Sequence, residues 1–157
     1  MPGQLETNPA LQKLQEFDRE AIEDAQFFRG EVTLIIRQDH LRSVCAFLRD
    51  APGLSFRYLS DLTAVDHYPN EPRFEVVYHL LSFGTNQRLR LKVRLAGDAP
   101  RVESVVSVWP GANAFEREVF DLFGIRFEGH PYLRRILLPE DWEGHPLRKD
   151  YPTEGYR

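Results

Sequence analysis

This sequence has a single cysteine, no long hydrophobic run and no excess of positive charge, and each shortage excludes a class of protein. With only Cys45, the chain forms no internal disulfide and lacks the four thiolates that an iron–sulfur cluster ordinarily requires. No apolar stretch approaches the ~20 residues of a membrane span, and the first residues do not resemble a signal peptide. The net charge of −4 argues against nucleic acid as a main partner. We therefore expect a soluble, cytosolic protein.

The order of the predicted elements indicates an α+β fold. The 157 residues suffice for one core that buries roughly two-thirds of the unfolded surface. We expect a mainly antiparallel sheet of about four or five strands, flanking helices and an extended C-terminal tail. The domain is expected at 1–128 and the tail at 129–157. Helices are predicted after the capping residues Asn8 and Asp39, and strands at 24–28, 31–37, 54–59, 73–83 and 87–95.

The strand predicted at 87–95 has one basic face. Its leucines and Val93 alternate with Arg88, Arg90, Lys92 and Arg94. Four positive charges on one face could bind an acidic partner. The favoured interpretation is a half-solvated antiparallel sheet whose charges prevent edge-to-edge pairing.

Two groups of potentially reactive side chains precede this strand. Cys45 shares a helical face with apolar residues, so we expect a buried and unreactive thiol. Asp61, Asp66 and His67 could form a metal-binding or acid/base set. Because no further ligand follows at fixed spacing, hydrogen bonding to turns and backbone is the favoured role of these three residues.

Residues 109–157 are unusually rich in aromatics and proline, with nine of the 19 aromatic residues and five of the 11 prolines. A short helix is predicted first, with a capping box formed by Asn113 and Glu116 and a left-handed end at Gly124. We expect Arg117 and Asp121, one turn apart, to pair on the helix surface. The apolar stripe that faces the core is expected to comprise Phe115, Val119, Leu122 and Phe123.

The segment after Gly124 has no pattern of a long helix or strand. Gly-His-Pro occurs at 129–131 and again at 144–146, and the residue before a proline is driven toward extended geometry. His130 and His145 are therefore expected on extended backbone. A segment so rich in proline, glycine and charge cannot form its own core and needs a surface to lie on.

Three interpretations of this tail remain open. The favoured one is a protein interface, because tyrosine, tryptophan and arginine dominate binding hot spots. The tail could instead only cover its own sheet. A metal or acid/base enzyme using His130, His145 and nearby carboxylates is disfavoured, because no nucleophile, phosphate-binding or metal motif is present. The interface residues would be Trp109, Tyr132, Trp142 and Tyr151 beside Arg126, Arg134, Arg135 and Arg148.

The run from Glu116 to Leu137 resembles the signature of one subunit of respiratory complex I, designated C in bacteria and known as the thirty-kilodalton subunit in mitochondria. The similarity extends from about Leu54 to Pro152 and includes Asp61-Leu62-Thr63 and the run from Gly144 to Pro152. The signature positions are Glu116-Arg117-Glu118, Asp121, Leu122-Phe123, His130, Arg134 and Ile136-Leu137.

The resemblance implies a non-catalytic structural subunit in the peripheral arm of a proton-translocating NADH:quinone oxidoreductase, on the cytoplasmic side of the cell membrane. It implies no catalytic, cofactor-binding or metal residue in this chain, with FMN and iron–sulfur clusters held by other subunits. The implied partner is chiefly the large quinone-site subunit, and the membrane is met only through the complex. A photosynthetic complex I-like or hydrogenase-type assembly is the alternative. Glu116 and Glu118 are expected to cap the helix or hold the tail. The expected interface residues are Glu116, Arg117, Glu118, Asp121, His130, Arg134, Arg135, Trp142, His145, Arg148, Lys149 and Tyr151.

Overall fold

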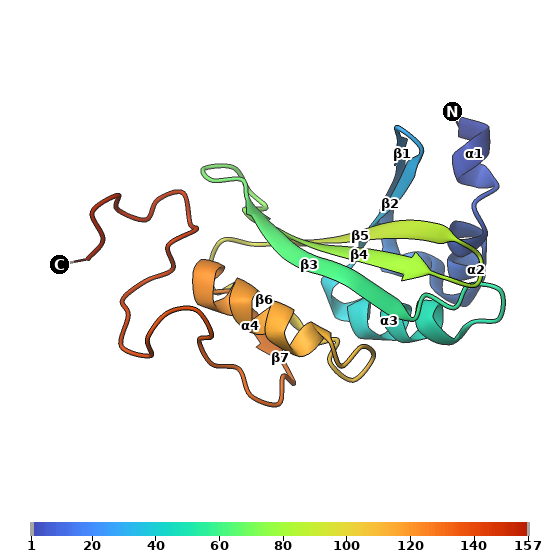
Figure 1. Cartoon of the computed structure of the whole chain (residues 1–157). Coiled ribbons are helices and arrows are strands. Elements are labelled where there is room, and N and C mark those ends of the chain that lie inside the picture. The colour runs from blue at the N-terminus through green and yellow to red at the C-terminus, as the bar shows by residue number, and fades with distance from the viewer. Residues whose placement is uncertain (1, 157) are drawn as a thin grey trace.

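Five strands form the central sheet in the order β1-β2-β5-β4-β3 in the computed structural model, which describes residues 2–156 (Figure 1). Only β2 and β5 run parallel; the other neighbours are antiparallel. The α+β class and the mainly antiparallel sheet are confirmed. The strands are β1 (Ile22–Phe28), β2 (Glu31–Ile36), β3 (Tyr58–Asp66), β4 (Phe74–Ser82) and β5 (Gln87–Leu95).

The third strand begins later than its sequence indicates. The apolar run at 54–59 predicted a strand there, but Leu54 and Phe56 are buried in the connection that follows α3. The strand itself runs from Tyr58 to Asp66 and includes the Asp61–Thr63 segment.

The helices are α1 (Pro2–Glu6), α2 (Pro9–Asp18), α3 (Leu41–Asp50) and α4 (Ala112–Phe123). Asn8 caps α2 as predicted, because its side chain accepts a hydrogen bond from the Leu11 N–H at 3.1 Å. Asp39 does not cap α3. It lies in a 3-10 turn (Gln38–His40), and α3 begins at Leu41. Within residues 2–156, none of the helices has the length and hydropathy that a membrane span needs.

Helices α3 and α4 lie on the same side of the sheet, below it in Figure 1. The apolar face of β5 points into the core between sheet and helices, as its alternation predicted. On α3, Cys45 is completely buried, and burial raises the pKa of its thiol far above the usual range, so the thiol is unreactive at neutral pH.

The basic face of β5 does not protect an edge of the sheet. Strand β5 is central, between β2 and β4, so the interpretation based on edge-to-edge pairing is wrong. Neighbouring strands supply acidic partners instead: Glu31 of β2 binds Arg90, and Glu75 of β4 lies 3.3 Å from Lys92. The order of strands, which sequence periodicity does not reveal, explains the error.

Two short strands flank α4 and pair in parallel as a separate sheet, β6 (Arg101–Glu103) and β7 (Arg126–Glu128). Residues 129–156 contain turns and bends but no helix or strand. In Figure 1 this tail leaves the region of β7 and continues past α4 to the end of the molecule farthest from α1 and α2.

Candidate docking surface

Helix α4 carries two completely buried carboxylates, Glu116 and Asp121. Both were expected on the polar side of the helix, so this part of the sequence interpretation is wrong. The helix begins at Ala112 without a side-chain cap, which also overturns the capping box of Asn113 and Glu116. Its end at Gly124 has the expected left-handed conformation, with φ of 76°. The apolar stripe is only partly confirmed: Val119 and Phe123 are buried, whereas Phe115 and Leu122 are half-buried.

Asp121 binds the tail and does not pair with Arg117. One oxygen accepts a hydrogen bond from Arg135 at 2.7 Å, and the other accepts from the backbone N–H groups of Ile136, Leu137 and Leu138 at 3.1, 2.8 and 3.0 Å. Burial alone would raise the pKa of Asp121, but these donors outweigh it and the pKa is lowered. A charged carboxylate therefore holds the tail against α4.

The tail also satisfies the last carbonyl groups of α4. Leu147 N–H donates to Leu122 O at 2.9 Å, and Arg148 Nε donates to Phe123 O at 2.6 Å. His145 Nδ1 lies 2.9 Å from Asp121 O. These groups have no partner within a helix, and a cation at this end suits the helix dipole.

Arg135 connects Asp121 to the middle of the tail. Its Nη2 donates to Trp142 O at 3.0 Å and to Gly144 O at 2.9 Å, while its Nη1 binds the Asp121 carboxylate. One guanidinium thus fixes both the start and the middle of the tail on the end of α4.

A second anchor joins the end of the tail to the loop between β3 and β4. The buried Asp66 accepts both hydrogen bonds of a bidentate pair with Arg73, at 2.8 and 2.9 Å, and a third from Lys149 N–H at 2.8 Å. Arg73 also binds Asp150 at 2.7 Å. Burial opposes ionisation of Asp66, but its hydrogen bonds prevail and lower the pKa strongly. Asp66 thus has the hydrogen-bonding role that its sequence favoured.

Arg117 and His130 hold the first part of the tail. Arg117 donates to the carbonyl groups of Arg134 and Arg135, both at 3.0 Å. His130 Nε2 lies 3.1 Å from Asn113 O, and its Nδ1 accepts from Tyr132 N–H at 2.9 Å. The rings of His130 and His145 therefore form hydrogen bonds with backbone groups, at two separate places. Among residues 2–156 no group of three or more histidine, cysteine or acidic side chains is placed to hold a metal ion.

While its backbone is bound to the domain, the tail leaves apolar side chains in solvent. Leu137 is 60% exposed and Trp142 is 42% exposed. Isolated exposed apolar residues are ordinary, whereas several of them on one segment make that segment a candidate interaction surface. We call this set the tail surface: Tyr132, Ile136, Leu137, Trp142, Leu147 and Tyr156.

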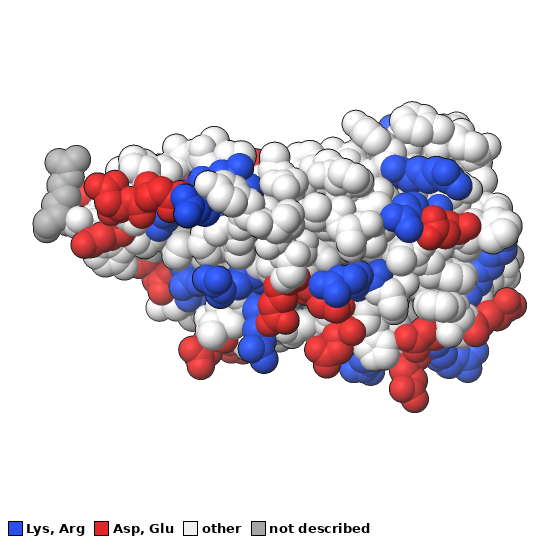
Figure 2. Space-filling model, turned by 90° about the horizontal axis from the view of Figure 1, so that it is seen from below, with Lys and Arg blue, Asp and Glu red and all other residues white. Residues whose placement is uncertain are grey.

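The remaining predicted interface residues divide into exposed and buried ones. Trp109 was expected in the interface but is only 3% exposed, and its indole N–H donates to Phe56 O at 3.0 Å, so it belongs to the core. Glu118 and the Lys149 side chain are exposed. Tyr151 is half-buried against Tyr156, and Arg134 lies over the Tyr132 ring. In Figure 2 acidic and basic side chains are interspersed, with wide uncharged areas between them.

Glu116 differs from Asp121 because no cation within residues 2–156 forms an ion pair with it. Its two oxygens accept from Ser104 Oγ at 2.6 Å and from Val105 N–H at 2.7 Å, which fixes the connection between β6 and α4. Burial raises the pKa of Glu116 to about 7, despite these two hydrogen bonds. Glu116 therefore titrates near neutral pH.

The E116Q variant is expected to lose a pH dependence of stability. Between pH 4.5 and about 7 the folded chain keeps the Glu116 proton more readily than the unfolded chain does. The contribution of Glu116 to the unfolding free energy therefore falls as pH rises through that window. Across the whole window the contribution of Glu116 to the unfolding free energy changes by about 3 kcal/mol. Because His79 and His145 have lowered pKa values and produce the opposite slope, the readout is the difference between E116Q and the parent in urea unfolding from pH 5 to 8. A difference that does not change with pH would contradict this assignment.

The comparison with known proteins now decides the family. The family model described as "Respiratory-chain NADH dehydrogenase, 30 Kd subunit" matches residues 34–157, which include α4 and the tail. The chain belongs to this family. A relative from Roseiflexus sp. (strain RS-1), named as the C subunit of NADH-quinone oxidoreductase, is 50% identical over 94% of this chain and 85% of its own length. The relative of the same name from Geotalea uraniireducens (strain Rf4) is 44% identical over 99% of this chain and 93% of its own.

Two solved structures share the fold. A trypsin-resistant fragment of Nqo5 has a TM-score of 0.67 at 31% identity, covering 79% of this chain and 99% of the fragment. A chain of the membrane-bound sulfane sulfur reductase, an archaeal respiratory membrane complex, has a TM-score of 0.77 at 26% identity, covering 91% of this chain and 84% of that one. The fold and the family are thus shown by independent comparisons.

Proposed function

We propose that this chain is a non-catalytic structural subunit in the peripheral arm of a proton-translocating NADH:quinone oxidoreductase. Its role is to carry the tail surface to another subunit, chiefly the large quinone-site subunit, on the cytoplasmic side of the cell membrane. The observation that carries the proposal is the division within residues 129–156, where backbone groups bind the domain and apolar side chains face outward.

The anchors prepare this segment for binding. A disordered tail would lose conformational entropy when it docks, whereas a tail already fixed by Asp121 and Asp66 loses less. The division into a domain at 1–128 and a docking tail at 129–157 is part of the proposal. One of the matched structures is a trypsin-resistant fragment of Nqo5, which covers 79% of this chain.

The proposal places FMN and the iron–sulfur clusters in other subunits. The one thiol of the chain, Cys45, is buried in the core beneath the sheet, away from any surface a cluster could share. The membrane would be met only through the assembled complex.

A related membrane-bound respiratory assembly is the second candidate. The TM-score of 0.77 to a chain of the archaeal sulfane sulfur reductase favours it. Purification of the tagged chain from its own cells separates the two candidates. Retained subunits and NADH:quinone oxidoreductase activity support the first candidate, whereas a retained complex without NADH oxidation supports the second. A chain recovered alone after mild detergent extraction contradicts both.

Arg117→Ala is expected to reduce assembly several-fold while leaving turnover per assembled complex unchanged. The variant loses two charge-assisted hydrogen bonds that hold the tail, each of roughly 1.5–3 kcal/mol. Native gel electrophoresis gives the amount of complex, and activity is then normalised to it. Arg29→Ala, at the exposed β1–β2 turn, is the matched control. Normal assembly with slow turnover would contradict a structural role.

A further inference from the structure

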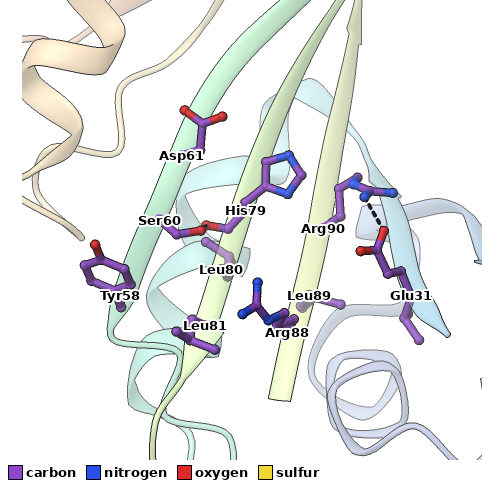
Figure 3. A pocket seen from close by; sticks show the side chains of 11 residues that line it. Glu31, Tyr58, Ser60, Asp61, His79, Leu80, Leu81, Arg88, Leu89 and Arg90 are labelled. Carbon is purple, nitrogen blue, oxygen red and sulfur yellow. Dashed lines mark hydrogen bonds and ion pairs between the residues drawn. The ribbon is translucent and has the colours of Figure 1, made fainter. Parts of the chain in front are cut away.

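A groove of about 430 Å³ lies on the face of the sheet opposite α3, and Figure 3 shows it from close by. Its outward-facing side chains come from β3, β4 and β5, with Glu31 of β2 at the far side. The strand register sets Tyr58 beside Leu81 and Leu81 beside Arg88. None of the residues that line this groove belongs to the tail surface, although Asp61 at one end also lines a small pocket with Leu147 of the tail.

A β-bulge in β3 forms one wall of the groove. The register shifts between Leu59 and Asp61, so Ser60 is an extra residue, and its hydroxyl donates to His79 O at 3.0 Å. Without the extra residue Asp61 would lie opposite the buried Tyr78 and point into the core, because neighbouring residues of a strand alternate between faces. The bulge therefore keeps Asp61 and Ser60 on the groove side.

Among the described residues, Arg88 is the cation of the basic face that has no acidic partner. Arg90 binds Glu31, drawn as a dashed line in Figure 3, and Glu75 is shared between Lys92 and Arg94, at 3.3 and 3.9 Å. Arg88 makes no ion pair or hydrogen bond within the described part of the chain. Of the two arginines that line the groove, Arg88 is therefore the one available to an acidic partner.

Tyr58 lines the groove together with Arg88, and its ring contacts that of Phe83. Tyr58 is 48% exposed and Phe83 is 73% exposed, and their ring centroids lie 5.5 Å apart. Leu81 lies half-buried between Tyr58 and Arg88. An arginine beside exposed aromatic side chains has the composition of a binding hot spot.

The two ends of the groove differ in charge. Asp61 lies at one end and Arg88 toward the other, with His79 between them in Figure 3. Burial, and then the neighbouring Arg90, lower the pKa of His79, so it is neutral at pH 7. A carboxylate is thus attracted at the Arg88 end and repelled at the Asp61 end, which fixes the orientation of an occupant.

We propose that this groove binds a short segment of a second protein that carries a carboxylate next to an apolar side chain. The carboxylate binds Arg88, and the apolar side chain packs on Tyr58 and Phe83. Because the residues that line the groove and those of the tail surface do not overlap, a segment in the groove leaves the tail surface free for another partner. This inference does not depend on what the tail binds.

Site-specific photocrosslinking in the native complex tests the proposal. Phe83 is replaced by p-benzoylphenylalanine, which preserves an aromatic ring, and crosslinked peptides are identified by mass spectrometry. Expected is one segment of another protein with Asp or Glu adjacent to an apolar residue. Adding R88E is expected to lower the crosslink yield at least about tenfold, the range for losing a buried charge contact, while R88K retains part of it.

Two controls make the result specific. R19E, at an exposed arginine in the turn that follows α2, leaves the yield unchanged, and all variants keep the thermal midpoint of the parent. Four outcomes overturn the proposal: no crosslink, a yield insensitive to R88E, a captured segment without a carboxylate, or a segment of a second copy of this chain. Each of these leaves the proposed role of the tail untouched, because the tail surface is unaltered in every variant.

Discussion

Asp121→Ala is expected to release the tail and to lower the free energy of unfolding by about 3–5 kcal/mol, the cost of breaking a buried charge pair. The substitution removes the carboxylate that pairs with Arg135 and leaves the three backbone N–H groups of Ile136, Leu137 and Leu138 without their acceptor. Urea unfolding gives the free energy. Limited trypsin digestion reports release of the tail through faster cleavage after Arg134 and Arg135.

Glu118→Ala is the matched control, because Glu118 is an exposed carboxylate on the same helix. A surface change of this kind alters stability by about 0.5 kcal/mol or less. If Asp121→Ala were no more destabilising than Glu118→Ala, and its tail no more sensitive to trypsin, the anchoring role of Asp121 would be wrong.

Leu137→Ala combined with Trp142→Ala is expected to leave the isolated chain folded and to weaken its binding to the complex by roughly 100-fold or more, because hot-spot residues contribute about 2 kcal/mol each. Both side chains point to solvent, so their removal costs the isolated chain little. The measurement is competition of purified variant and parent for incorporation into the complex.

Phe28→Ala is the control for this pair, because Phe28 is 70% exposed at the β1–β2 turn, far from the tail surface. It is expected to compete as well as the parent. Equal incorporation of the double variant would show that no partner covers Leu137 and Trp142.

The sequence correctly predicted the features that depend on interactions between neighbouring residues. The alternation of β5, the Asn8 cap and the left-handed Gly124 each depend on residues within a few positions, and each is confirmed. The sequence could not reveal that β5 is central or that β3 contains a bulge. Both follow from pairing between strands that are distant along the chain.

At the candidate docking surface, too, the sequence does not reveal interactions between residues that are distant along the chain. Sequence alone selected Glu116, Asp121 and Arg135, but it assigned Glu116 to capping the helix or holding the tail, and Asp121 to a pair with Arg117 on the helix surface. Their partners lie 11 to 17 residues away in the chain, and a charged residue on a helix is exposed unless such partners exist. Several signature residues therefore hold the tail against its own domain. The exposed apolar side chains of the tail belong to the signature only in part.

The difference between anchoring and contact residues has a practical consequence. We expect substitution of Asp121 or Arg135 to alter the stability of the chain itself, and substitution of Leu137 or Trp142 to change only what the chain binds. Assembly defects from the first pair are therefore accompanied by a lower unfolding free energy, and those from the second pair are not.

Hydroxyl-radical footprinting, performed on the isolated chain and on the purified complex, tests most directly whether a partner protein covers the tail surface. Expected is oxidation of Leu137 and Trp142 that is slower in the complex by about fivefold or more, as for side chains in the core of an interface. Phe83 is excluded from the comparison because it borders the groove. Equal oxidation of Leu137 and Trp142 in the two samples would contradict a docking role for the tail.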